Sequence, residues 1–422
     1  MDDKIFMLNA SPSTTYDELL LPARLLLPSC PSRRSCPGLS DEDWVALGVQ
    51  RVLEVCSSGR AFLQTHGVHW EHCPETSHYF HTLKSQRRLD LVQELNERLQ
   101  AHLSEFLPDE LEGYSQLAHF DIYAGDGHWH GAAAHDPRIE EKTHATGHFY
   151  ALDLRRRTLR HLTVGEGRKE HDIHALKRLG SKVLRQGAPR GRKVLYVWDK
   201  AGIDFRFWYD LKHSSGIYFI SLEKENMTLE PMGEHPWETN DPVNHGVLSD
   251  QLVGTSNGVP LRRIRCEAPD NGQSRVFITS EMTLPPGLIA HLYHRRWQIE
   301  KAFDSLKNKL METKSWATHP VAKTAQAHFI CLTHNLLRRI EVILATREQI
   351  TNQPDERRRK ERLNQQKQRT LDAGRLWPST WDTLLKPVQF SVKLLRWLRS
   401  SIASKLPWHT ALPRLRALYA SL

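Results

Sequence analysis

The sequence has few cysteines and no long apolar run. Six cysteines in 422 residues do not make a disulfide framework of the kind that stabilises small secreted proteins, so we expect reduced thiols. No apolar run reaches the roughly 18 residues that a membrane helix needs, and Asp2 and Asp3 stand where a secretory signal would carry positive charge. We therefore expect a cytoplasmic protein without a membrane partner.

The composition is that of a chain that folds, but its charge is uneven. Apolar residues make up 39% and charged residues 25% of the chain, close to globular averages, and 422 residues suit two or three domains of about 150 residues each. Residues 351–422 hold 15 Lys and Arg against 5 Asp and Glu, whereas the preceding residues are nearly balanced. This basic tail predicts non-specific contact with a polyanion such as DNA, or a part in dimer assembly; a solvated charge run is the alternative.

Hydrophobic periodicity divides the chain into five stretches. A helical region (1–115) precedes a stretch of alternating strands and helices (116–223) and a turn-rich, β-rich insertion (224–274). Next come a strand and two long helices (275–346), then a basic helical region (347–422). The order predicts an α/β fold with a mixed sheet flanked by helices, as in ribonuclease-H-like domains.

Individual elements follow from the same patterns. Ser40, followed by three acids, predicts the N-cap of a helix that Gly59 stops. The expected strands are 119–124, 147–154, 158–164, 193–198, 217–222, 247–254, 259–266 and 275–279. The other expected helices are 83–106, 173–185, 205–212, 286–310 and 322–346.

Three acids are candidates for catalysis. Asp126 and Asp199 each follow a predicted strand, where open sheets place their ligand sites, and Glu300 on the long helix completes a three-carboxylate cluster. Acids this close repel one another unless a cation neutralises them, and carboxylate oxygens suit Mg²⁺ or Mn²⁺. Two such ions about 4 Å apart support phosphodiester displacement. Asp121 and Asp136 are alternatives for the first acid.

The long helix carries a stripe of polar residues. Tyr293, Arg296, Glu300 and Lys307 stand at offsets of 0, 3, 7 and 14 residues. On a regular helix these offsets fall within an arc of about 60°, so the four side chains can address one target. A surface ion pair between Arg296 and Glu300 is the alternative reading.

This stripe, with the letters RWQIE from Arg296 to Glu300, resembles the Tyr-Arg-Glu-Lys motif of DDE transposases in the insertion sequence four family. The Asp-Gly at Asp126 and the Asp-x-x-Gly at Asp199 are similar to the contexts of that family's other two acids. The similarity covers about residues 121–310. One departure is His128, since the family often has a small hydroxyl residue there.

The resemblance implies a ribonuclease-H-like core with a β-rich insertion before Glu300. It implies cut-and-paste transfer of DNA, with terminal inverted repeats and target DNA as substrates, two Mg²⁺ ions (or Mn²⁺) per active site, and a homodimer. Asp126, Asp199 and Glu300 would hold the metals and carry catalysis.

The remaining residues of the motif would contact DNA. Tyr293, Arg296 and Lys307 would bind phosphates near the cleaved end. Trp297 is a further candidate through base stacking, although we favour its packing against the sheet. Two competing functions stay open: a catalytically inactive, transposase-derived DNA-binding protein, and a ribonuclease-H-like nuclease for RNA hybrids.

Overall fold

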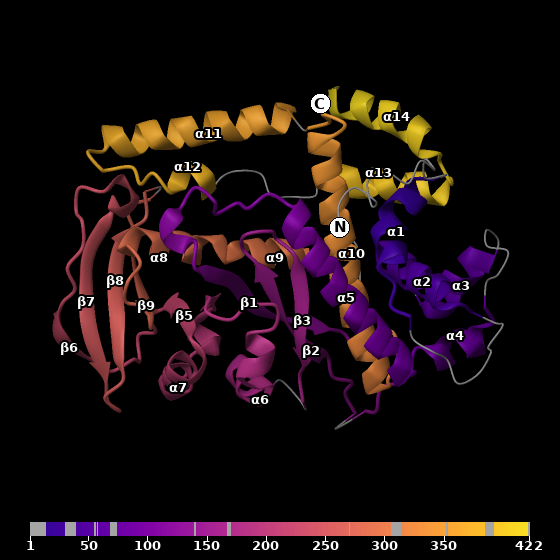
Figure 1. Ribbon diagram of the computed structural model, residues 1–422, viewed down its shortest axis with the longest axis horizontal. Helices are drawn as coiled ribbons and strands as arrows, with labels where there is room; N and C mark the ends of the chain where they lie inside the picture. Colours follow the sequence, from indigo (N-terminus) through magenta and orange to yellow (C-terminus); the bar gives the residue numbers. More distant parts are fainter. Residues whose placement is uncertain are drawn as a thin grey trace.

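The computed structural model (Figure 1) shows a sheet with helices packed on it and further helices at both ends of the chain. Lys307 is outside the residues that the structure describes. The described residues are 14–29, 39–54, 56, 58–67, 74–138, 141–166, 170–269, 271–304, 314–351, 353–384 and 392–420.

In the described part of the chain, five α-helices precede the sheet. Ser40 caps the second, as predicted, because its side chain accepts a hydrogen bond of 3.0 Å from the amide of Asp43; that helix ends at Leu53, before the predicted stop at Gly59. The fifth buries Leu95 and Leu99 in a core shared with α10 (Pro320–Thr346). The five helices are α1 (Thr15–Leu25), α2 (Asp41–Leu53), α3 (Gly59–Gly67), α4 (Thr76–Thr82) and α5 (Gln86–Phe106).

Nine strands of the described residues form one mixed sheet in the order β3-β2-β1-β4-β5-β9-β8-β7-β6. β1, β4 and β5 are parallel, and the other neighbours are antiparallel. The prediction of a mixed α/β chain is therefore confirmed. The strands are β1 (Phe120–His130), β2 (Thr146–Asp153), β3 (Leu159–Val164), β4 (Lys193–Val197), β5 (Ile217–Leu222), β6 (Leu229–Glu234), β7 (Val247–Thr255), β8 (Pro260–Glu267) and β9 (Ser274–Thr279).

Strand β4 is buried on both faces. Val194 and Tyr196 belong to the core under α6 (Asp172–Leu184) and α7 (Phe205–Ser215). Leu195 and Val197 belong to the core that contains residues of α5 and α10. Because apolar side chains meet a core on either side, the strand is a continuous apolar run, as parallel strands generally are.

The tail packs against α1 and also contacts the segment that follows β8. Leu398 and Leu415 are buried in the same core as Leu19 of α1, and Thr370 donates a hydrogen bond of 2.7 Å to the carbonyl of Pro269, just after β8. The tail helices are α11 (Gln353–Asp372), α12 (Trp381–Leu384), α13 (Val392–Ala403) and α14 (Trp408–Ala420).

Two further predicted boundaries are wrong. β1 continues to His130 because antiparallel pairing with β2 persists after parallel pairing with β4 has ended. The long helix is instead two helices, α8 (Pro286–Arg295) and α9 (Trp297–Asp304), that meet at Arg296. The chain tightens at this junction, because the amides of Arg296 and Ile299 each donate a hydrogen bond to the carbonyl three residues earlier.

None of the described helices combines the length and apolar character that crossing a membrane requires. Cys56, Cys266 and Cys331 are thiols that take no part in a disulfide.

A close helix contact provides a test of the packing. A Cβ added at Gly48 of α2 would lie 2.1 Å from the Phe329 ring of α10. We therefore expect Gly48→Ala to lower the free energy of unfolding by about 1–3 kcal/mol, measured by chemical denaturation. Gly113→Ala is the control, since a Cβ there meets nothing within 4 Å; equal effects of the two changes would contradict the packing of α2 on α10.

Candidate active site

Asp126 and Asp199 lie next to each other where the parallel pairing of β1 and β4 ends. The last parallel pair joins Ala124 to Val197, and each acid stands two residues beyond it. Neighbouring strands are about 4.8 Å apart, so the two backbones are adjacent at this point. The prediction that Asp126 follows the strand is wrong. Asp126 lies inside β1, opposite Tyr150 of β2.

Backbone contacts orient both carboxylates. Asp126 Oδ1 accepts a hydrogen bond of 2.9 Å from the amide of the next residue. Asp199 Oδ1 accepts one of 2.7 Å from Ala201, and so caps a short 3₁₀ turn. Gly125 brings the two segments close, because a Cβ there would lie 2.3 Å from the Trp198 ring.

Arg296 joins the first acid to the third. Its Nη1 lies 3.8 Å from Asp126 Oδ2, and its Nη2 donates a hydrogen bond to Glu300. The Tyr293 ring centroid lies 5.8 Å from Arg296 Cζ. The Arg296 side chain is 14% exposed and that of Glu300 38%. The structure thus brings Asp126, Glu300, Arg296 and Tyr293 together.

Helix α9 is anchored to the sheet by its apolar residues. Ile299 and Phe303 are buried, and the Phe303 ring contacts Tyr150 at a centroid distance of 5.4 Å. His128 stacks on Phe303 at 5.0 Å with an interplanar angle of 25°. These contacts hold Glu300 at the edge of β1, and they give His128 a packing role.

Burial and like charge raise the pKa of Asp126. Burial is the largest cause, Asp199 and Asp172 raise the pKa further, and Arg296 opposes them; the result is about 7 against an ordinary 3.8. Burial, together with the charge of Asp199, also raises the pKa of Asp172 to about 6. The three aspartates therefore share one electrostatic environment.

Asp172 is a site residue that the sequence reasoning missed. It begins α6, and its Oδ1 lies 3.5 Å from where a Cβ at Gly127 would be. α6 also packs against the 3₁₀ turn that Asp199 caps. An acid in the first turn of a helix is ordinary in any sequence, because it complements the helix dipole. The sequence therefore held no sign that sets Asp172 apart.

The site fits a hard divalent cation by its donors. Asp126, Asp199 and Asp172 offer carboxylate oxygens, the ligands that Mg²⁺ and Mn²⁺ prefer, and their mutual repulsion is what a cation relieves. No three Asp, Glu, His or Cys side chains in the described part of the chain stand close enough to hold an ion together. Glu300 is engaged by Arg296 instead.

The two alternatives for the first acid lie elsewhere. Asp121, at the amino end of β1, pairs with Arg192 at 2.8 Å. Asp136 pairs with Lys323 at 3.0 Å and accepts a hydrogen bond of 2.7 Å from the amide of Ala133. Both carboxylates stabilise local structure.

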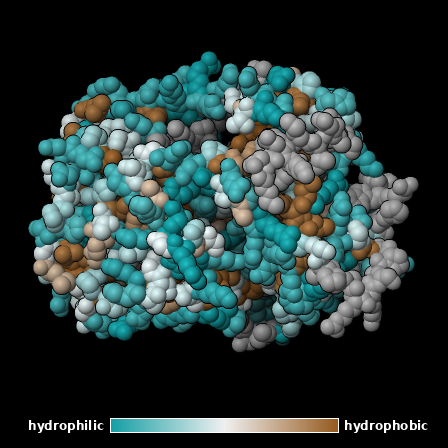
Figure 2. Space-filling view, in the orientation of Figure 1, coloured by the Kyte–Doolittle hydropathy of each residue, from teal (hydrophilic) through white to brown (hydrophobic). Residues whose placement is uncertain are grey.

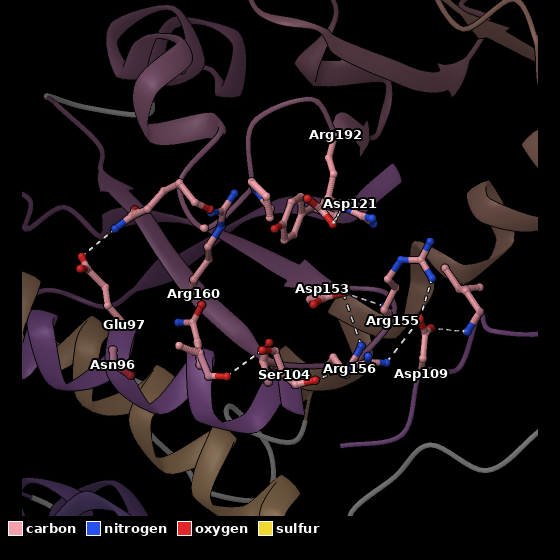
Figure 3. A pocket seen from close by; sticks show the side chains of 18 of the residues that line it. Asn96, Glu97, Ser104, Asp109, Asp121, Asp153, Arg155, Arg156, Arg160 and Arg192 are labelled. Carbon is pink, nitrogen blue, oxygen red and sulfur yellow. Dashed lines mark hydrogen bonds and ion pairs between the residues drawn. The ribbon is translucent and has the colours of Figure 1, made fainter. Parts of the chain in front are cut away.

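A cavity of about 790 Å³ opens near Asp121, away from the acidic site (Figure 3). Figure 3 shows Arg192 reaching Asp121 and Arg155 reaching Asp109 in its wall. Arg155 also donates to the carbonyl of Phe120 at 3.0 Å. Because these arginines are paired with acids and carbonyls of the wall, the cavity does not present the free positive charge that DNA needs.

The predicted DNA contacts are placed as follows. Trp297 is 59% exposed, so the expectation that it packs against the sheet is wrong. Lys301 Nζ lies 4.8 Å from the centroid of the Trp297 ring. Tyr293 is mostly buried beside Phe277, with ring centroids 5.3 Å apart. The prediction for Lys307 falls outside the described residues.

Comparison with known proteins shows what this chain is similar to. The family model described as "Transposase DDE domain" matches residues 126–336, half of the chain. "Putative transposase y4zB" of Sinorhizobium fredii (strain NBRC 101917 / NGR234) is 26% identical over 149 residues, which cover 34% of this chain and 41% of the relative. The chain thus matches about two fifths of that curated relative's length. The matched family segment contains Asp126, Asp199 and Glu300.

The raised pKa of Asp126 predicts a pH-dependent stability in the presence of a chelator. Between pH 3.8 and about 7 the unfolded state loses this proton while the folded state keeps it, so the wild type loses stability as the pH rises through that window. Asp126→Asn should gain on the order of 2 kcal/mol over the wild type above pH 7 and almost nothing near pH 3. Denaturant titrations across this range test it.

The control is Asp210→Asn, an exposed acid of α7. A stability difference between Asp126→Asn and wild type that does not change with pH would contradict the assignment.

Proposed function

The chain belongs to the family of proteins with a transposase DDE domain, and on this premise we propose that it is a DNA transposase of the insertion sequence four type. In this proposal it cuts DNA at the terminal inverted repeats of its own element and joins the ends to target DNA by a cut-and-paste route.

One observation carries the proposal: three acids from separate elements lie near the carboxyl ends of β1 and β4, and Arg296 bridges two of them. Asp126 comes from β1, Asp199 follows β4, and Glu300 lies on α9, linked to Asp126 through Arg296. The fold keeps Asp126 buried although its ionisation is unfavourable there. A DNA-binding descendant without catalysis has no need of such a site, and this supports the enzyme.

We assign Asp126, Asp199 and Glu300 as the residues that hold two Mg²⁺ ions, with Mn²⁺ as a substitute. Such cations supply charge stabilisation and an activated water or 3′-hydroxyl for in-line phosphodiester displacement. The chain's own contribution is to hold the donors in place: backbone amides orient two of the carboxylates, and Asp172 adds negative charge beside them.

The residues around the acids suit a DNA end. Arg296 offers a planar fork that matches a phosphate, and Lys307 a point charge. The Tyr293 ring lies beside the Arg296 guanidinium, with its centroid 5.8 Å from Arg296 Cζ. The exposed Trp297 ring has room for a base to stack. No comparable stripe is needed to cut RNA hybrids, so duplex DNA is the better substrate.

Helix α11 offers a second DNA surface. Arg357, Lys360 and Arg362 are exposed on it, and hydrophilic residues predominate along the top of the molecule in Figure 2, where Figure 1 places α11. Its carboxyl end is held at Pro269, after β8. Strand pairing through β9 places the end of β8 at the same sheet edge as the end of β5, so this surface and the acids lie toward one edge.

We also propose a homodimer as the active complex. An element has two ends, and cutting and joining both of them together requires two active sites.

Replacing Asp199 tests the chemistry. Asp199→Asn removes one carboxylate without changing the size of the side chain, so we expect Mg²⁺-dependent cleavage of plasmid DNA that carries the element's ends to fall at least about 100-fold. Binding to the same DNA in a gel-shift assay should be retained. The exposed Asp210→Asn is the control, and undiminished cleavage by Asp199→Asn would support the inactive, DNA-binding alternative.

Substitutions on α11 test the second surface. Truncation at Thr351 is unsuitable, since it removes Leu398 and Leu415 from the core. We expect Arg357→Gln with Lys360→Gln to lower the dependence of log affinity on log salt by about 2, because each phosphate contact contributes about 0.9. Fluorescence anisotropy over a salt series measures this slope.

The control removes two arginines from exposed pairs on other helices, Arg98→Gln with Arg206→Gln. A slope that is unchanged by the α11 substitutions, or lowered equally by the control, would show that α11 is not on the DNA.

A further inference from the structure

The guanidinium of Arg296 lies between two of the acids. Its Nη1 is 3.8 Å from Asp126 Oδ2, and its Nη2 donates to Glu300 on the next turn. The Tyr293 ring packs on the guanidinium, whose side chain is only 14% exposed. Arg296 is therefore a fixed positive charge in the place where the assigned ligands require a cation.

One positive group and a divalent cation compete for the same oxygens. While Glu300 accepts a hydrogen bond from Arg296, it does not join Asp126 and Asp199, and no three potential ligands in the described ranges stand together. Arg296 therefore holds Glu300 while its Nη1 also lies 3.8 Å from Asp126 Oδ2.

A DNA phosphate changes this balance. Arginine binds phosphate oxygens through two parallel N–H donors, and a phosphate that reacts at the acids must approach within reach of Arg296. Glu300 is 38% exposed, so its side chain has room to turn once its partner is taken. DNA that engages Arg296 frees Glu300 for the other two acids.

We propose that Arg296 is a positioning residue that couples DNA binding to metal binding: without DNA it holds Glu300 away from the cation, and on DNA it releases Glu300. This rests on the proposed function. By thermodynamic reciprocity, the factor by which DNA tightens cation binding is also the factor by which the cation tightens DNA binding. The protein then completes its metal site only where its substrate is present.

The test measures Mn²⁺ binding to the full chain by electron paramagnetic resonance, with and without a short blunt DNA duplex, after correction for Mn²⁺ bound by the duplex alone. For the wild type we expect the duplex to lower the Mn²⁺ dissociation constant about tenfold, within the usual range of coupling. Arg296→Gln should bind Mn²⁺ about tenfold more tightly than the wild type without DNA, and the duplex should then add little.

Two further variants separate the causes. Lys200→Gln removes an exposed positive charge directly beside Asp199 in the sequence, so a general charge effect would tighten Mn²⁺ binding equally in Lys200→Gln and Arg296→Gln and would overturn the proposal. Glu300→Gln should bind Mn²⁺ weakly with or without DNA. This variant tests the proposal if Arg296→Gln does not fold. Retention of the full DNA effect in Glu300→Gln would also overturn the proposal.

Failure of the coupling differs from failure of the proposed function. If Asp199→Asn abolishes Mn²⁺ binding while Arg296→Gln behaves as the wild type, the metal site stands and the coupling is wrong. If Asp199→Asn binds Mn²⁺ as the wild type does, the assigned site is wrong, and the coupling falls with it.

Discussion

The parallel pairing of β1 with β4 is the constraint on which the site depends. Both strands contribute apolar residues to the cores that cover the sheet, and a slip of one residue would turn every side chain of a strand to the opposite face. The register that joins Ala124 to Val197 is therefore fixed by burial. Asp126 and Asp199, two residues further on, become neighbours as a consequence of packing.

Acids that lie close together repel one another, and the rest of the site reduces this repulsion. Asp126 and Asp172 are both less readily ionised than free carboxyls, because burial and the charge of Asp199 act on each. Arg296 supplies the opposing charge within the protein. The same features that make this edge unfavourable for three anions make it favourable for a cation and a phosphate, and this links stability to function.

Local patterns predicted the elements that depend on residues close in sequence. The strand at 217–222 and the cap at Ser40 are found as expected, since an apolar run and a capping side chain both act on near neighbours. The single helix predicted over 286–310 is instead divided at Arg296 in its described part, because hydrogen bonding tightens there and separates two helices. Trp297 was expected to pack against the sheet and is exposed instead.

The sequence by itself determined which functional groups the site can use. These are two aspartates near strand ends, a glutamate spaced from an arginine and a tyrosine, and a basic tail. Tertiary structure decided which groups meet. It separated Asp126 from Asp121 and Asp136, which pair with Arg192 and Lys323 instead, and it brought in Asp172 from a helix start. Such choices depend on strand register and helix packing between residues far apart in the chain, and no local spacing encodes those distances.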